Sequence, residues 1–303
     1  MPDRVLALAR KLEWDFPTSA GRPLRDPAKA EPLLSRRHEL PESARQLDDE
    51  QATELAGRTW RVWMAARDIP GGREFLAPVL ERRVDSRWSA IAFYGDGLFA
   101  FWVGAHDDAR RRNEESLRIA QRVDDPEALT LAHLGMSRAL LDSGDFGAAR
   151  KHATAACDLA ESADEAMLQG PTHLQAQSAR LDGDYDAAAQ LFEQSLALNR
   201  RLDSPDMVDV EHHNLGHVEI HRGNVEAAAK HFAQTPHSAD AFGQAMMNLN
   251  NAQVAFAQGE VERARTLLEA AEGGFVGSFM EHAAIDDRFE LDWLREQLEC
   301  AAN

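Results

Sequence analysis

The stretch HNLGHVEIHRGNVEAAAKHF, residues 213–232, contains the pattern that decides the fold. Its corner glycine, Gly223, comes seven residues after the small residue Gly216 and five residues before Ala228. The same three-point pattern recurs around four further glycines, Gly104, Gly144, Gly183 and Gly259. The first four are about 40 residues apart, and the last interval is slightly shorter. A fixed period in this range is typical of stacked repeats, so the sequence predicts a solenoid.

Each repeat is predicted to be a pair of helices that meet at the glycine. In the fourth copy, apolar residues recur at helical spacing over 207–222, and a return helix is expected over 225–234. Glycine suits the corner because helices often end in a left-handed residue, which glycine adopts without strain. Alanine, leucine, glutamate and arginine dominate the composition, and β-branched residues are sparse. We therefore predict an all-α fold.

The repeat copies resemble the tetratricopeptide repeat at the corner and in the return helix. The matching residues are Leu215, Gly216, Gly223, Asn224, Val225, Ala228 and Phe232 in one copy and Gly183, Asp184, Tyr185, Ala188 and Phe192 in another. The resemblance covers roughly residues 87–272 and implies a right-handed superhelical solenoid. The period exceeds the usual length of about 34 residues. This longer form is similar to the repeat arrays of large bacterial transcriptional regulators and of peptide-pheromone receptors.

Three segments are expected. Residues 51–272 would form about six helix pairs, the first of them degenerate, with Arg67 in place of the corner glycine and Gly72 in place of the alanine. Residues 1–50 contain a short helix and a proline-rich strap, either ordered on the solenoid or flexible. Leu33, Leu34 and Leu40 favour docking of this strap. Residues 273–303 would supply an amphipathic capping helix with a buried leucine stripe of Leu291, Leu294 and Leu298.

Composition and motifs limit the possible functions. The formal net charge of −18, from 51 acidic and 33 basic residues, argues against direct nucleic-acid binding. We find no signal peptide or membrane span, so a cytoplasmic protein without a membrane partner is expected. No nucleophile elbow, phosphate-binding loop, dinucleotide fingerprint or metal-ligand motif occurs. The sequence thus favours a non-enzymatic protein without catalytic residues, metal or cofactor, and its oligomeric state stays open.

The candidate binding surface lies on the first helix of each repeat. Residues ten, six and three before each corner glycine share one face, because successive residues turn by about 100°. In the family resembled, this stripe faces the concave groove. The stripe comprises Tyr94, Leu98, Phe101, Leu134, Arg138, Leu141, His173, Gln177, Arg180, His213, His217, Ile220, Leu249, Gln253 and Phe256. Such a groove would be apolar at its ends and polar in the middle, a pattern common in binding sites.

The candidate ligand-binding residues are the polar members of this stripe and two asparagines at its border: His173, Gln177, His213, His217, Arg138, Arg180, Asn214, Asn250 and Gln253. Amide and guanidinium groups suit the backbone and terminal carboxylate of an extended peptide. A peptide or protein segment is therefore the expected ligand, captured in a regulatory setting. We expect replacement of His213 and His217 to weaken binding with little effect on stability.

The histidines leave other interpretations open. His213, His217 and His221 share one helix face, and a pair at this spacing can hold Zn²⁺, with His173 as a third ligand. A small-molecule receptor or an enzyme that uses a histidine-lined channel is therefore an alternative function. An assembly scaffold that binds partners on its convex face is another alternative. His133 and His212 lie on the packing side and are predicted to be core histidines.

Overall fold

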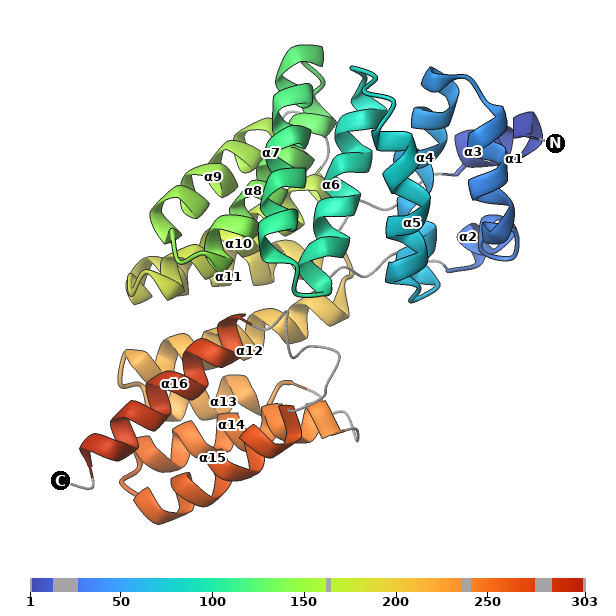
Figure 1. The fold of residues 1–303 in the computed structure, drawn as a ribbon. Helices are drawn as coiled ribbons and strands as arrows, with labels where there is room; N and C mark the ends of the chain where they lie inside the picture. Colours follow the sequence, from blue (N-terminus) through green and yellow to red (C-terminus); the bar gives the residue numbers. More distant parts are fainter. Residues whose placement is uncertain (1, 13–26, 162–164, 236–240, 276–284, 302–303) are drawn as a thin grey trace. The chain divides into compact units, whose positions relative to one another are not determined.

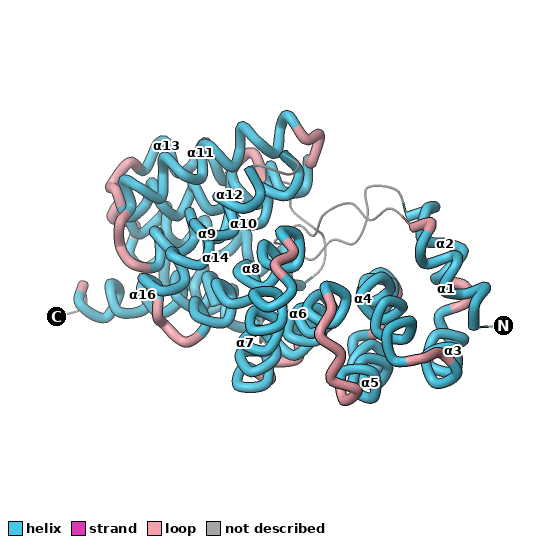
Figure 2. The backbone as a smooth tube through the Cα atoms, turned by 90° about the horizontal axis from the view of Figure 1, so that it is seen from above, coloured by secondary structure: helices cyan, strands magenta, loops and turns pink. Residues whose placement is uncertain are grey.

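The computed structural model describes residues 2–12, 27–161, 165–235, 241–275 and 285–301. Within these ranges the chain forms helices and connecting loops without a strand, which confirms the all-α prediction (Figures 1 and 2). Consecutive helices pack as pairs, as expected for a solenoid. The pairs are α4 (Asp49–Ala65) with α5 (Ile69–Leu80), α6 (Arg87–Trp102) with α7 (His106–Val123), α8 (Pro126–Asp142) with α9 (Phe146–Glu161), α10 (Gln169–Leu181) with α11 (Tyr185–Arg201), α12 (Pro205–His221) with α13 (Val225–Phe232), and α14 (Ala241–Ala257) with α15 (Val261–Phe275).

The chain divides into two compact units, residues 1–174 and 175–303. In the first unit, α1 (Pro2–Arg10), α2 (Pro27–Leu34) and α3 (Leu40–Gln46) pack against α4. A short 3-10 turn, Arg37–Glu39, precedes α3. The second unit ends with α16 (Ile285–Cys300), which packs against α14 and α15.

The described part of the N-terminal strap docks as its leucines suggested. Leu33 and Leu40 are buried, whereas Leu34 is half-buried. The Arg82 guanidinium, just after α5, donates to the carbonyl oxygens of Ala44 at 2.8 Å and of Leu47 at 3.2 Å. Residues 13–26, which contain the first prolines of the strap, lie outside the described residues.

Replacing Leu40 by alanine should destabilise the protein by about 2–4 kcal/mol, because the leucine is fully buried and alanine leaves a cavity. Denaturant unfolding would measure the loss, with Glu31→Ala on the exposed side of α2 as the matched control. Limited proteolysis should leave residues 27–46 intact in the native chain. Rapid cleavage within that range would contradict docking.

The inter-helix corners are left-handed, as the glycine pattern predicted. The backbone angle φ is 72° at Gly104, 77° at Gly144, 81° at Gly183, 77° at Gly223 and 82° at Gly259. The degenerate first pair has the same geometry, since Arg67 adopts a φ of 55° at its corner. The repeat is therefore structurally intact even where its glycine has been lost.

Valine at Gly183 or Gly223 should lower the free energy of unfolding by about 1–2 kcal/mol, because a branched β-carbon is strained at positive φ. A β-carbon at either corner would meet no atom within 4 Å, so the expected cost comes from the backbone and not from a clash. Gly147→Ala is the control, because that helical glycine has equally open surroundings without the positive φ. Unchanged melting temperatures in both valine variants would contradict the left-handed geometry.

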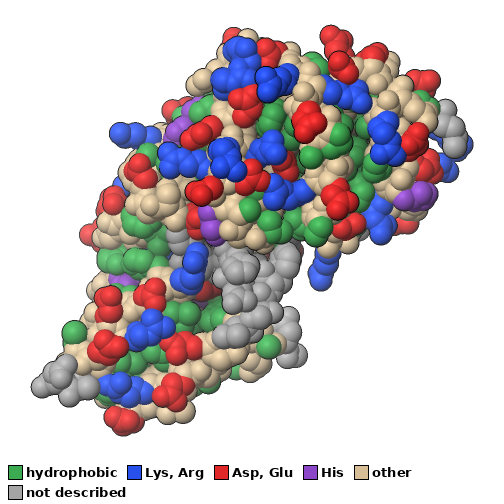
Figure 3. All heavy atoms as spheres, viewed as in Figure 1, with side chains coloured by type: hydrophobic (Ala, Val, Ile, Leu, Met, Phe, Trp, Pro, Cys, Tyr) green, Lys and Arg blue, Asp and Glu red, His purple; other side chains and the backbone are tan. Residues whose placement is uncertain are grey.

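The surface carries charges of both signs. On the face drawn in Figure 3, basic and acidic side chains alternate without forming a large field of one sign. The arginines of α7 illustrate this arrangement, because Arg110 pairs with Glu114 and Arg111 pairs with Asp108. Within the described ranges, no helix combines the length and the apolar character needed to cross a membrane.

Candidate functional site

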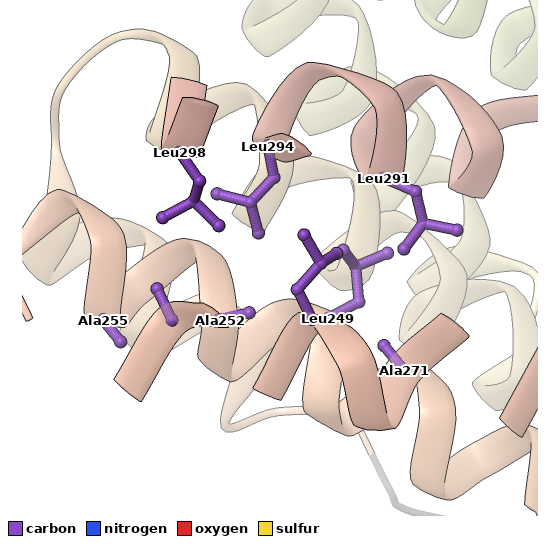
Figure 4. Packing of buried hydrophobic residues seen from close by; sticks show 9 residues of the cluster. Leu249, Ala252, Ala255, Ala271, Leu291, Leu294 and Leu298 are labelled. Carbon is purple, nitrogen blue, oxygen red and sulfur yellow. The ribbon is translucent and has the colours of Figure 1, made fainter. Parts of the chain in front are cut away.

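The capping helix α16 is bound through the leucine stripe that the sequence predicted. Leu291, Leu294 and Leu298 are buried in one cluster with Leu249 of α14 and Leu268 of α15 (Figure 4). Small residues of the two partner helices complete this cluster: Ala252, Ala255, Ala264 and Ala271. Close packing of leucine on alanine holds the backbone of α16 near α14 and α15.

Glu290 of α16 lies at the centre of a buried polar cluster. Its side chain is 0% exposed, as is that of Arg180, and the Arg180 Nη1 donates to Glu290 Oε1 at 2.8 Å. His221 Nε2 lies 3.0 Å from Glu290 Oε2, and Gln253 Nε2 donates to the same oxygen at 2.6 Å. Arg180, His221 and Gln253 belong to α10, α12 and α14. One carboxylate therefore joins the first helices of three repeats.

The geometry fixes where the protons of this cluster lie. Because Gln253 donates through its amide nitrogen, its oxygen accepts from His217 Nδ1, 2.6 Å away. A neutral His217 then accepts through Nε2 from His213 Nε2 at 3.0 Å. His213 in turn accepts through Nδ1 from Asn250 Nδ2 at 3.3 Å. A directed chain of hydrogen bonds thus runs from Asn250 to Glu290, with each donor matched to an acceptor.

The electrostatics agree with this assignment. Burial lowers the pKa of His217 well below its ordinary value of 6.5, although the nearby Glu290 carboxylate opposes this shift. Burial alone would raise the pKa of Glu290, but His217, the hydrogen bond from His221 and the charge of Arg180 together lower it to about 2. The centre is therefore a buried ion pair of Arg180 and Glu290, to which the His221 ring and the Gln253 amide are hydrogen-bonded.

His221 connects the buried cluster to a surface pocket. Its ring stacks on Tyr185, with centroids 4.5 Å apart and planes 3° from parallel, and it meets Trp293 edge-on at 4.5 Å. His221 and Tyr185 also line an open pocket of about 460 Å³, together with Gly183, Asp184, Asp186, Arg222 and Asn224. Burial and the nearby Glu290 raise the pKa of Tyr185, so its hydroxyl stays protonated and can donate a hydrogen bond.

A family model and solved structures match this fold. The model described as tetratricopeptide repeat matches residues 130–155, 169–194 and 249–270, which fall on α8 and α9, α10 and α11, and α14 and α15. The chain contains tetratricopeptide repeats. The matched helix pairs turn at Gly144, Gly183 and Gly259, so these corners belong to repeats of that family, as the resemblance implied. No curated protein matches its sequence.

Three solved tetratricopeptide-type structures illustrate the similarity. NprR in complex with its cognate peptide NprX is 19% identical with a TM-score of 0.64, over 88% of this chain and 79% of NprR. A Rap protein complexed with Competence and Sporulation Factor is 14% identical with a TM-score of 0.56, over 89% of this chain and 83% of the other. A tetratricopeptide repeat protein from Parabacteroides merdae is 11% identical with a TM-score of 0.56, over 100% and 99%. At these identities the similarity is one of fold.

Five of the predicted site residues come together. They belong to the hydrogen-bonded cluster that ends at the carboxylate of Glu290: Arg180, His213, His217, Asn250 and Gln253. Asn214 is buried and donates to the Val210 carbonyl oxygen of its own helix at 2.9 Å. Gln177 is buried on α10, one turn before Arg180. Arg138 and His173 are buried as well and belong to the first unit.

The stripe on the first helices is covered, whereas the sequence predicted that it lines a groove. Its residues are buried, apart from His213 and Phe256, which are half-buried. In the second unit α16 covers the stripe, because Asp287 and Glu290 contact its polar residues and the leucines pack on Leu249. In the first unit the stripe packs on neighbouring helices, for example Tyr94 against Trp60 at a ring-centroid distance of 5.7 Å. A ligand of the polar stripe would therefore have to replace α16.

Glu290 and Asp287 are the site residues that the motif search missed. Both are buried on α16 at helical spacing with Leu291 and Leu294. Asp287 Oδ1 lies 3.7 Å from His213 Nε2. The sequence did contain a signal for them, because both acidic residues lie on the leucine face of the predicted capping helix. A carboxylate buried on such a face needs a cationic or hydrogen-bond-donating partner elsewhere in the chain.

The packing-side histidines form two equivalent pairs, in which His212 is buried as predicted, whereas His133 is half-buried. His133 Nδ1 lies 3.0 Å from His152 Nδ1, and His212 Nδ1 lies 3.0 Å from His231 Nδ1. Arg200 donates to His212 Nε2 at 3.2 Å, so His212 must carry its proton on Nδ1 and donate it to His231. In the described part of the chain, no three metal-ligating side chains are arranged to hold a metal ion.

Acidification should destabilise the protein between pH 6.5 and 4. Burial, together with the neighbouring His152, lowers the pKa of His133 from 6.5 to about 4, and burial also lowers the pKa values of His152, His212 and His231. The unfolded chain binds these protons first, so stability is complete above pH 6.5 and falls as the pH drops to 4. Because His133 is only half-buried, we expect its protonation to contribute about 1–2 kcal/mol to this loss of stability.

Unfolding curves measured at pH 7 and pH 4.5 would test this prediction. His133→Gln should reduce the loss on acidification, because glutamine keeps hydrogen-bonding capacity without titrating. His38→Gln, which replaces an exposed histidine, is the matched control. Equal pH dependence in the native chain and in His133→Gln would show that His133 titrates normally.

Proposed function

We propose that this tetratricopeptide-repeat protein captures a peptide or protein segment on the inner face of its first helices, as a regulatory binding module. The observation that carries the proposal is the way in which α16 is bound to this face. Arg180, His221 and Gln253 already hold one helical segment through its carboxylate on this face. NprR, which shares the fold, is described in complex with its cognate peptide NprX, and the Rap protein in complex with Competence and Sporulation Factor.

The polar content of the inner face supports a peptide as the ligand. Helix packing in a solenoid requires only apolar and small residues, whereas buried donors without partners are costly. Arginine, histidine, asparagine and glutamine side chains recognise carboxylates and backbone amides with defined geometry. These residue types occupy the inner face at Arg138 in the first unit and at Arg180, His213 and Gln253 in the second.

Selection of peptides from a random display library against the purified protein would test the function. Calorimetric titration of a selected peptide should show at least about tenfold weaker binding to Arg138→Ala or to His213→Ala, since each removes a polar contact on the inner face. Arg110→Ala, an exposed site on α7, is the control. Unchanged affinity in both inner-face variants would exclude this surface.

A small-molecule receptor is the second candidate, favoured by the pocket beside Tyr185 and His221. Its volume of about 460 Å³ suits a compact ligand, and its lining offers an aromatic ring, a cation and carboxylates. Thermal-shift screening of a metabolite set, repeated with Tyr185→Ala, would test it. A stabilising compound that retains its effect in the variant would exclude this pocket.

A scaffold with an apolar convex interface has less support. Among the described residues, Val103 is the large hydrophobic side chain that is clearly exposed, at 43%. Stable protein interfaces usually bury a core of several apolar or aromatic residues.

A further inference from the structure

We propose that the inner face of α10, α12 and α14 recognises a helical segment of another protein that presents a glutamate followed by leucines, and that α16 occupies this face as an internal copy of that segment. The proposal rests on the function proposed above and specifies the ligand class. The partner carries a carboxylate with leucines one, four and eight residues later, as Leu291, Leu294 and Leu298 follow Glu290.

The receptor for the carboxylate is assembled from three repeats. Arg180, His221 and Gln253 lie on separate helices, and their donors converge on the two oxygens of Glu290 within 3.0 Å. His217 lies behind Gln253 and orients its amide through the 2.6 Å contact. Charge-assisted hydrogen bonds of this kind discriminate strongly between a carboxylate and a neutral amide.

The apolar part of the face sets the helical register. Leu291, Leu294 and Leu298 enter the cluster of α14 and α15 (Figure 4). Trp293 packs on a second cluster formed by Ile220, Ala228 and Phe232. Anchors at such spacing are the pattern by which an amphipathic helix lies in a groove. A ligand would therefore need the carboxylate and the leucines on one helix face.

A simple cap does not require this arrangement. Closing a solenoid needs only a helix with an apolar inner face and a polar outer face. A buried ion pair contributes little net stability compared with apolar residues of the same volume. The donors on three repeats therefore exceed what capping requires, and they match the recognition of a specific acidic group. Covering them with α16 keeps the face closed until a competing segment arrives.

Two full-length variants should open the face to an added segment. The probe is a fluorescein-labelled peptide of residues 285–299, and binding is measured by anisotropy. In the native chain α16 competes at a high effective concentration because it is tethered. Glu290→Gln, which weakens the tethered competitor, should bind the peptide at least about tenfold more tightly than the native chain does. Glu296→Gln, at an exposed site of the same helix, should bind like the native chain.

A second variant and a second peptide make the result specific. Leu298→Ala weakens the apolar contacts of α16 while it leaves Arg180 and Glu290 in place, so it should also gain peptide binding. The same peptide carrying Glu290→Gln should bind the opened chain about tenfold or more weakly. The proposal is overturned if both folded variants bind neither peptide, or if the two peptides bind equally. If the native chain forms a dimer and Glu290→Gln dissociates it, the face binds a second copy of this chain. That result would also overturn the proposal.

Hydrogen exchange separates this proposal from the proposed function. A library-selected peptide added to the native chain should accelerate exchange of the α16 amides if it replaces α16. Tight binding of that peptide without any change in α16 would support peptide capture and overturn exchange with α16. Binding of the 285–299 peptide to the opened variants, without any library peptide that binds the native chain, would support this face and leave peptide capture without support.

Discussion

Glu290→Ala should destabilise the protein by about 3–5 kcal/mol, the largest effect that we expect from a single substitution. Glu290 and Arg180 are both fully buried, and alanine leaves the guanidinium charge without its carboxylate. His221 and Gln253 lose their acceptor in the same step. Denaturant unfolding with a linear extrapolation would measure the change.

A compensating pair of substitutions distinguishes the buried charge from lost packing. Arg180→Met combined with Glu290→Leu removes both charges with similar volumes and should recover most of the lost stability. Glu296→Ala, exposed on the same helix, should change stability by less than about 0.5 kcal/mol. A cost below about 1 kcal/mol for Glu290→Ala would show that the ion pair is solvated in solution.

His213→Ala combined with His217→Ala should lower stability by about 2–4 kcal/mol, in contrast to what the sequence suggested. His217 is 1% exposed, and its ring fills space beside Phe232 at a centroid distance of 5.2 Å. Its loss also leaves the Gln253 oxygen without a donor. The cost therefore combines a cavity with an unsatisfied polar group.

Thermal unfolding of the single and double variants would check this expectation. His213 is partly exposed, so His213→Ala alone should cost less than His217→Ala. His38→Ala, at an exposed position, is the control. An unchanged melting curve for the double variant would show that both histidines line a groove, as the sequence predicted, and do not belong to the core.

The repeat could be predicted from the sequence because it depends on local geometry. A corner with positive φ selects glycine, and helices that pack closely select small residues at fixed positions such as Gly216 and Ala228. These signals recur five times, so chance agreement is small. Arg67 shows the limit of the signal, because its corner has the same backbone geometry without the glycine that reveals it.

The candidate site could be predicted only in part. The helical period placed His213, His217 and Gln253 on one face, and the structure joins these side chains by hydrogen bonds. Which segment covers that face depends on the tertiary structure and not on the local sequence. Glu290 is 110 residues away from Arg180 in sequence, and no local spacing connects them. The period also gives no measure of burial, so it could not distinguish an open groove from a face that is already occupied.

The contact between Arg180 and Glu290 has a consequence for how the second unit unfolds. In an ordinary repeat array each repeat contacts only its neighbours, so the ends fray and the stability of the array is a sum of local terms. Here a residue of α10 is tied to the last helix, and α12 and α14 share the same carboxylate. Opening any one of these helices exposes the buried charge that the others need. The helices tied to α16 should therefore melt in a single all-or-none transition instead of repeat by repeat from the C-terminal end.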